Sequence, residues 1–188
     1  MAGGTGDPMG DQELFEPFPK IARLFRDCTI TEKIDGTNAQ VIVTEDGSVL
    51  AGSRTRLIST HADNHGFARW VAENEDDLKT LGVGRHFGEW WGSGIQRGYR
   101  LKEKRFSLFN VKRWSEVRPA CCHVVPTLYA GPFDTKIVRD VLHELKTYGS
   151  YASPGFMKPE GIIVWHDAAR QFFKITCEKD EAPKSLVA

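Results

Sequence analysis

The apolar residues of this chain fall in short runs separated by glycine, proline, aspartate and asparagine, and this pattern limits the possible folds more than any other feature. Runs typical of β-strands occur within residues 29–53, 85–89, 105–111, 162–165 and 171–177. Apolar residues recur at helical spacing over residues 64–81 and 134–148. The sequence therefore predicts an α+β fold of antiparallel sheets with flanking helices.

Local signals sharpen some of these predictions. Within residues 29–53, a polar break at 35–38 and a turn at 45–47 predict an antiparallel meander. The helix over residues 134–148 has Asp134 or Thr135 as its cap and Gly149 after its end. The last two strands are expected to pair as a hairpin.

A chain of 188 residues with no internal repeat and no linker is the length of one domain. Residues 1–12 are predicted to be a flexible tail, and residues 13–188 a single α+β domain. No signal peptide or membrane-spanning run is found. We therefore expect no membrane partner. The four cysteines lack metal-ligand spacing, so we expect reduced thiols and a cytoplasmic location.

The charge of the chain is balanced, with 25 Lys and Arg against 25 Asp and Glu. This excludes proteins that hold nucleic acid through a large overall positive charge. Residues 85–118, however, hold nine Lys or Arg against three Glu. Together with Trp90, Trp91, Tyr99 and Trp114, this segment predicts either a stacking surface for single-stranded nucleic acid or charged loops around core aromatics.

Residues 31–38, with the sequence TEKIDGTN, carry the most informative chemistry. Lys33 and Asp35 alternate at a strand end and therefore face the same side, and Gly36 allows a sharp turn beside them. A lysine amine in this position can attack an electrophile, while the aspartate orients it or holds a metal-bound water. The pattern alone is also common in charged strands that enter a turn.

Further segments follow in the order found in the covalent nucleotidyltransferases, the superfamily of ligases and capping enzymes. The chain closely resembles the phage-type ATP-dependent RNA ligases, whose nucleophile motif matches residues 32–38, with Asp35 where these ligases often have histidine. The other matches are residues 53–54 to motif Ia, 87–92 to motif III, 106–110 to motif IIIa, 160–164 to motif IV and 173–176 to motif V. The resemblance covers residues 29–176 and implies that residues 13–188 are a nucleotidyltransferase domain of antiparallel sheets with flanking helices.

Motif V differs from the family pattern. The family usually has two lysines separated by one residue, whereas this chain has Lys174 followed by Ile175 and Thr176. Two questions stay open: which of the two lysine roles Lys174 performs, and whether Lys179 or an arginine takes the other.

The resemblance implies that Lys33 attacks the α-phosphorus of ATP and forms lysyl-AMP, that the AMP passes to an RNA 5′-phosphate, and that a 3′-hydroxyl then joins the ends. A lysine attacks as a neutral amine, and nearby carboxylates oppose the loss of its proton. We therefore expect Lys174 and Mg²⁺ or Mn²⁺ to supply positive charge, with Asp35 and Glu160 holding the ion through water. Glu32 is expected to position the adenine or the lysine.

The resemblance also implies the contacts to the nucleotide. Glu89 is expected on the ribose hydroxyls, and Asn38 nearby on the sugar or the phosphate edge. Arg54 is expected on the ATP phosphates and later on the RNA 5′-phosphate. Phe109 is predicted to stack on adenine, in preference to Phe106 on the same segment.

Three alternatives remain. DNA ligases and capping enzymes usually add an OB-fold domain after motif V, whereas 14 residues follow Lys174, so we expect no C-terminal OB-fold domain. A nucleotide- or RNA-binding module without turnover is the third, and Thr176 supports it. In preference to these three alternatives, we expect a monomeric RNA ligase that acts on 3′-OH and 5′-phosphate RNA ends.

Overall fold

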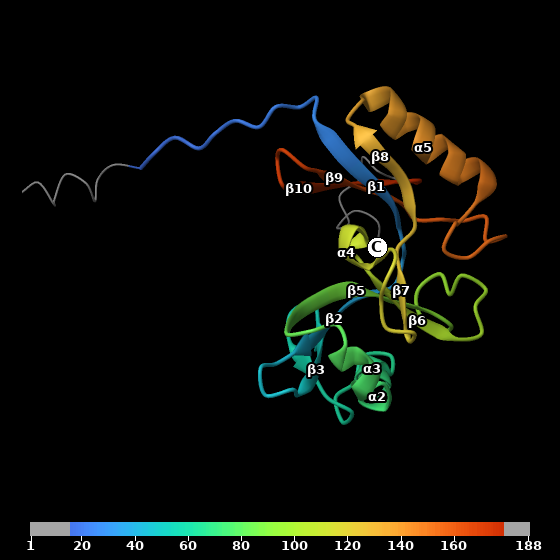
Figure 1. Ribbon diagram of the computed structural model, residues 1–188. Helices are drawn as coiled ribbons and strands as arrows, with labels where there is room; N and C mark the ends of the chain where they lie inside the picture. The colour runs from blue at the N-terminus through green and yellow to red at the C-terminus, as the bar shows by residue number, and fades with distance from the viewer. Residues whose placement is uncertain (1–15, 179–188) are drawn as a thin grey trace, which may run out of the picture.

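The computed structural model describes residues 16–178 and confirms the α+β class. Within these residues the fold consists of two β-sheets and four helices (Figure 1). One sheet and its helix form the upper half of Figure 1, and the other sheet and its helices form the lower half. The predicted tail at residues 1–12, the start of the predicted domain at residues 13–15 and Lys179 lie outside the described residues.

The first sheet has four antiparallel strands in the order β10-β9-β1-β8. They are β1 (Asp27–Lys33), β8 (Thr127–Pro132), β9 (Gly161–His166) and β10 (Gln171–Thr176). Helix α5 (Thr135–Tyr148) packs on one face of this sheet. The core between them contains Ile30, Ile162 and Val164 from the strands and Val141 and Leu145 from the helix.

Helix α5 and the β9–β10 hairpin are where the sequence predicts them. The Asp134 side chain accepts a hydrogen bond from the Lys136 backbone N–H at 2.6 Å, which caps the first turn of the helix. Gly149 follows the helix end with φ of 84°, a conformation that glycine adopts without steric cost. None of the helices within residues 16–178 is long and apolar enough to cross a membrane.

The second sheet has six strands in the order β4-β3-β2-β5-β6-β7, all antiparallel except the β6–β7 pair. Its strands are β2 (Thr37–Val43), β3 (Val49–Ser53), β4 (Leu57–Ile58), β5 (Gly84–Gly92), β6 (Lys104–Leu108) and β7 (Cys122–Val124). Helices α2 (Phe67–Glu73) and α3 (Glu75–Lys79) cover one face, and α4 (Val111–Trp114) follows β6. The aromatic rings of Phe67 and Trp70 on α2 pack against those of Trp90 on β5 and Phe106 on β6.

The predicted meander over residues 29–53 is wrong at its first turn. Strand β1 joins the first sheet, whereas β2 and β3 join the second, so residues 34–36 cross from one sheet to the other. Ile34 is buried in a small third core with Trp91, Tyr99 and Phe156, which fixes this crossing. A Cβ at Gly36 would collide with the Trp90 carbonyl oxygen, so only glycine fits there.

Two other elements differ from the sequence prediction. The helix predicted over residues 64–81 is divided into α2 and α3 at Asn74. The strand predicted at residues 85–89 continues to Gly92, which places Trp90 and Trp91 in a buried strand rather than in a loop.

Candidate active site

A cleft of about 810 Å³ lies between the two sheets. The first sheet contributes Thr29, Thr31, Ile163, Trp165 and Phe172, and the second side contributes Asn38, Arg85, His86, Phe87 and residues 109–114. A cleft of this volume is large enough for a nucleotide. Its walls are mostly apolar, which suits an aromatic base.

The strand register brings Lys33 and Lys174 to the cleft face of the first sheet. Thr31, Ile163 and Lys174 are paired across β1, β9 and β10, and partners in such a row point to the same face. Because Thr31 and Ile163 line the cleft, Lys174 faces it too. Lys33 lies two residues beyond Thr31 and therefore shares that face.

Lys33 forms an ion pair with Glu160, which lies just before β9. The distance from Lys33 Nζ to Glu160 Oε1 is 2.5 Å, and both side chains are largely buried. The second oxygen, Glu160 Oε2, is buried and has no hydrogen-bond partner within residues 16–178. A buried carboxylate oxygen without a partner is unfavourable unless a cation or donor binds there, so Glu160 is suited to hold a metal ion.

Asp35 lies beside this pair, and both its backbone N–H and its carboxylate are hydrogen-bonded. Its backbone N–H donates to the Tyr99 hydroxyl at 2.8 Å. Its carboxylate oxygen Oδ2 accepts from Arg97 Nε at 2.8 Å, and Arg97 Nη1 donates to the Lys158 carbonyl at 3.0 Å. The sequence did not single out Arg97 as a site residue, and its only signal was the basic excess of residues 85–118.

The donor set fits Mg²⁺ or Mn²⁺ bound with a nucleotide. Within residues 16–178, no group of three or more His, Cys, Asp or Glu can hold a metal by itself. Asp35 and Glu160 provide two carboxylates, and Mg²⁺ is typically held by one or two carboxylates together with substrate phosphates and water. The orphaned Glu160 Oε2 is the atom that this arrangement would satisfy.

Glu89 is buried on the facing side of the second sheet. Its two carboxylate oxygens accept from the Gly36 backbone N–H at 3.1 Å and from Asn38 Nδ2 at 3.2 Å. Burial raises the pKa of Glu89 to about 7; Asn38 and the nearby Lys33 charge oppose the rise, and Glu160 adds to it. Lys33, Glu89 and Glu160 are therefore close enough to interact electrostatically.

Phe109 and Phe106 have different environments. Phe109 is 36% exposed and lines the cleft, whereas Phe106 is fully buried in the core of the second sheet. The stacking of Phe109 on adenine stays a prediction, and its position permits that contact. Trp165 and Phe172 also line the cleft, with ring centroids 4.4 Å apart, and the sequence did not single them out.

Comparison with known proteins decides the family. The family model described as RNA ligase matches residues 26–176, which is most of the chain. The chain belongs to the RNA ligase family. A search of curated protein sequences finds no match.

Solved structures of an RNA ligase from Naegleria gruberi are similar to this member of the RNA ligase family. One variant with ATP and Mn has a TM-score of 0.64 and 19% identity over 82% of this chain and 51% of that chain. A variant without ligand has a TM-score of 0.63 and 20% identity over 80% of this chain and 49% of that chain. The likeness shows the shared fold, and the chain spans about half the length of the Naegleria protein.

Glu32 and Arg54 are not brought together with the other predicted site residues. Glu32 lies on the opposite face of β1 from Lys33, fully buried. It accepts hydrogen bonds from Ser150 Oγ at 2.6 Å and from the Tyr151 and Ala152 backbone N–H groups at 2.8 and 2.9 Å. Burial raises the pKa of Glu32, and these bonds oppose the rise.

Arg54 lies in the exposed turn between β3 and β4. Its side chain forms no hydrogen bond or ion pair with any other described residue. Its predicted contact with phosphate therefore remains a prediction that rests on motif Ia.

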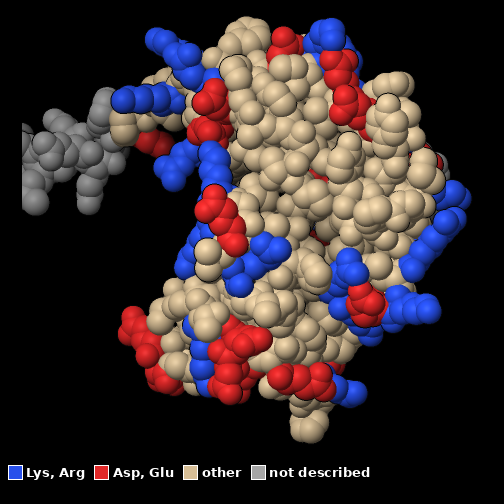
Figure 2. Space-filling view, turned by 45° about the vertical axis from the view of Figure 1, so that its right-hand side comes forward, with Lys and Arg blue, Asp and Glu red and all other residues tan. Residues whose placement is uncertain are grey.

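The basic segment at residues 85–118 does not expose the aromatic residues that the stacking hypothesis needed. Trp90, Trp91, Tyr99 and Trp114 are all buried, so the alternative of charged loops around core aromatics is correct. In Figure 2 the Lys and Arg side chains form separate groups, and a broad area of that face carries no charge.

Proposed function

We propose that this chain is the catalytic domain of an ATP-dependent RNA ligase that joins 3′-OH and 5′-phosphate RNA ends. The observation that carries the proposal is the Lys33 amine, which lies on the strand face that borders a nucleotide-sized cleft and pairs with a carboxylate whose other oxygen is buried without a described partner. The match of residues 26–176 to the RNA ligase family supports it.

Lys33 acts as the nucleophile in the first step. Its ammonium loses a proton, and Nζ then attacks the α-phosphorus of ATP; a P–N bond forms and the P–O bond to pyrophosphate breaks. In the second step an RNA 5′-phosphate oxygen attacks the same phosphorus, so AMP moves to the RNA and Lys33 recovers its amine. In the third step a 3′-hydroxyl loses its proton and attacks the RNA 5′-phosphorus, which forms a phosphodiester and releases AMP.

Asp35 and Glu160 would hold Mg²⁺ or Mn²⁺, which would supply positive charge beside the phosphates. The Naegleria gruberi ligase was solved with ATP and Mn, which supports the same cofactors here. Lys174, on the cleft face of β10, provides a fixed positive charge for the phosphates. Thr176 occupies the row of Lys33, where a second motif V lysine would stand.

The remaining contacts hold the nucleoside and phosphates. Glu89 and Asn38 bind the ribose hydroxyls, and the exposed face of Phe109 stacks on adenine. Arg54 binds phosphate from the turn after β3. Glu32, predicted from the motif to position adenine or lysine, acts on Lys33 through the backbone of β1 and the loop after α5.

The chain is further proposed to be a cytoplasmic monomer. Four free cysteines support a reducing location. Joining of broken RNA ends is the chemistry of RNA repair, and the form of the nucleophile motif supports a phage-type enzyme.

Incubation with α-labelled ATP and Mg²⁺ tests the proposal. We expect acid-labile label that remains on the denatured protein and is abolished by Lys33→Ala. Lys136→Ala, which removes an exposed lysine of α5, is the matched control and should keep the label. Absence of label on the wild type, with ATP binding retained, would instead identify a binding module without turnover.

Two further assays separate the related enzymes. Label from GTP rather than ATP would indicate a capping-type enzyme. Pre-adenylated strands that end in ribose or deoxyribose 3′-OH distinguish RNA from DNA ligation, because an RNA ligase should seal the ribose-ended strand faster.

A further inference from the structure

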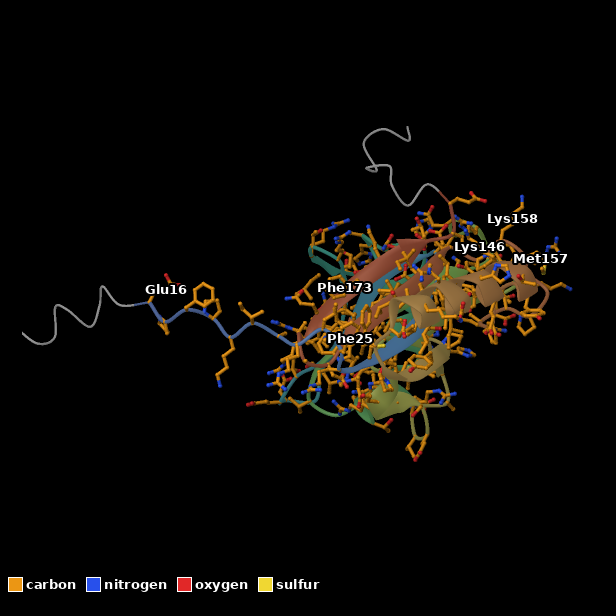
Figure 3. The ribbon with its side chains drawn as sticks, turned by 90° about the horizontal axis from the view of Figure 1, so that it is seen from above. Glu16, Phe25, Lys146, Met157, Lys158 and Phe173 are labelled. Atoms are coloured by element: carbon orange, nitrogen blue, oxygen red, sulfur yellow. The ribbon has the colours of Figure 1, made fainter. Side chains whose placement is uncertain are left out.

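Arg97 is the cation nearest to Asp35, and it reaches the site from the loop between β5 and β6. Its side chain is 31% exposed, and it bridges Asp35 to the Lys158 carbonyl, two residues before Glu160. Figure 3 shows Lys158 at the same end of the molecule as Lys146 and Met157. Arg97 therefore connects the two chain segments that carry the metal-binding carboxylates.

The loop around Arg97 is held in place by buried residues on both sides. Ile95 and Tyr99, two residues before and after Arg97, are fully buried. The Tyr99 carbonyl also accepts from Ser153 Oγ at 2.9 Å. Because both flanking residues are fixed, the backbone holds Arg97 close to Asp35, while its guanidinium can still change partners.

The charges of the site are balanced in pairs. Lys33 pairs with Glu160 and Arg97 pairs with Asp35, so each proposed metal-binding carboxylate already has a cation beside it. A divalent ion beside Asp35 would share this carboxylate with the Arg97 guanidinium, which already occupies Oδ2, and the two positive charges would repel each other. Arg97 has three further N–H donors beyond the two that contact Asp35 and Lys158, and a guanidinium binds phosphate oxygens in a bidentate manner.

We propose that Arg97 is a phosphate-binding residue of this ligase that Asp35 holds in position until Mg²⁺ and ATP bind. When the metal takes its place on Asp35, the Arg97 guanidinium turns to the triphosphate of ATP. Arg97 is also close enough to Cys177, the residue after Thr176, to affect the Cys177 pKa. It thus provides positive charge at the end of β10, where motif V has threonine in place of its second lysine.

This assignment rests on the proposed function, because it takes Asp35 and Glu160 as the metal-binding pair. It also makes two predictions of opposite sign for one variant. Without Arg97, Asp35 is no longer neutralised, so the metal alone should bind more tightly. The triphosphate loses a ligand, so the nucleotide should bind more weakly.

The experiment compares Arg97→Gln with the wild type in two binding assays. Electron paramagnetic resonance measures the Kd for Mn²⁺ without nucleotide, and Arg97→Gln should lower it by about tenfold, the scale of removing one charge about 5 Å from a divalent ion in a high-dielectric site. Equilibrium dialysis with the non-transferable analogue α,β-methylene-ATP and Mg²⁺ should show a Kd raised by about tenfold, as expected for one lost charge-assisted contact.

Two further variants serve as controls. Arg100→Gln removes an exposed arginine from the same loop, and both Kd values should stay within about twofold of the wild type, because screened surface charges contribute little. Arg97→Lys keeps the positive charge but loses the guanidinium, which can bind two phosphate oxygens at once. The Mn²⁺ Kd should therefore stay near the wild-type value while the nucleotide Kd rises. Circular dichroism verifies that each variant is folded.

An unchanged or raised Mn²⁺ Kd in Arg97→Gln would overturn the proposal, as would an unchanged nucleotide Kd. Neither assay requires lysyl-AMP to form. If the wild type takes no label from ATP while both shifts appear, the ligase function fails and the Arg97 assignment stands. If the label forms and the shifts do not appear, the assignment fails and the ligase function stands.

Discussion

Replacement of Glu89 by glutamine should change the pH dependence of the stability of the protein. Burial raises the pKa of Glu89 from 4.5 to about 7 in the folded protein. Between these values the folded state binds more protons than the unfolded state, so the free energy of unfolding decreases as the pH rises, and the decrease is complete above about pH 7. The difference between these two pKa values corresponds to about 3 kcal/mol in total, of which about 2 to 3 kcal/mol falls between pH 5 and pH 8.

Glu89→Gln has no charge to bury and should lose this dependence. Glutamine keeps the shape and can accept from the Gly36 N–H, while Asn38 can turn its amide to pair with the new NH₂ group. Urea denaturation at pH 5 and pH 8 gives the unfolding free energy of both proteins. The variant should gain about 2 to 3 kcal/mol relative to the wild type on going from pH 5 to pH 8.

Glu73→Gln on α2, an exposed position, is the matched control and should follow the wild type at both pH values. An equal difference between Glu89→Gln and the wild type at pH 5 and pH 8 would refute the reasoning. The same titration should affect the proposed ribose contact, because the carboxylate is the better acceptor. Affinity for α,β-methylene-ATP is therefore expected to rise through about pH 7 in the wild type and to stay level in Glu89→Gln.

Substitutions of Glu32, of the two phenylalanines of motif IIIa and of Glu160 give three further tests. Glu32→Ala should lower the free energy of unfolding by about 3 kcal/mol, because three buried donors lose their acceptor. Glu32→Gln can still pair with all three groups, so its free energy of unfolding should stay within about 1 kcal/mol of the wild-type value. Urea denaturation measures both. Phe106→Ala should cost about 3 to 5 kcal/mol of stability, and Phe109→Ala less than about 1 kcal/mol but about tenfold in nucleotide affinity by dialysis. Glu160→Ala should reduce the rate of lysine adenylation more than about 100-fold with ATP, and a wild-type rate would remove Glu160 from the metal site.

The elements that the sequence predicted well depend on local signals. Helix α5 has a capping aspartate, one apolar face and a terminal glycine, all within about four turns, and the β9–β10 hairpin joins two runs that are adjacent in sequence. The same local pattern could not reveal that β1 and β2 part into different sheets. That choice depends on Ile34 packing against Trp91 and Phe156, which are distant in sequence.

The site residues also include some that the sequence indicated and some that only the structure shows. The motif at residues 32–38 indicated Lys33 and Asp35, and the structure adds the Lys33–Glu160 pair and the burial of Glu89. Arg97 could not be found from the motif because it meets Asp35 across 62 residues of sequence. Glu32 shows the opposite problem: it lies inside the motif, yet its carboxylate supports the loop after α5.

The crossing at residues 34–36 has a mechanical consequence for the cleft. Lys33 ends a strand of one sheet and Asn38 lies near the start of a strand in the other, so a rotation between the sheets turns about the chain next to the Lys33 amine. At the opposite end of β1, the sheets are bridged by the exposed Lys112–Asp167 pair at 2.9 Å, which contributes less than about 1 kcal/mol. A rotation of one sheet against the other therefore widens the cleft at the Lys112–Asp167 end. Lys33 and Asn38 lie close to the axis of this rotation and keep their relative positions.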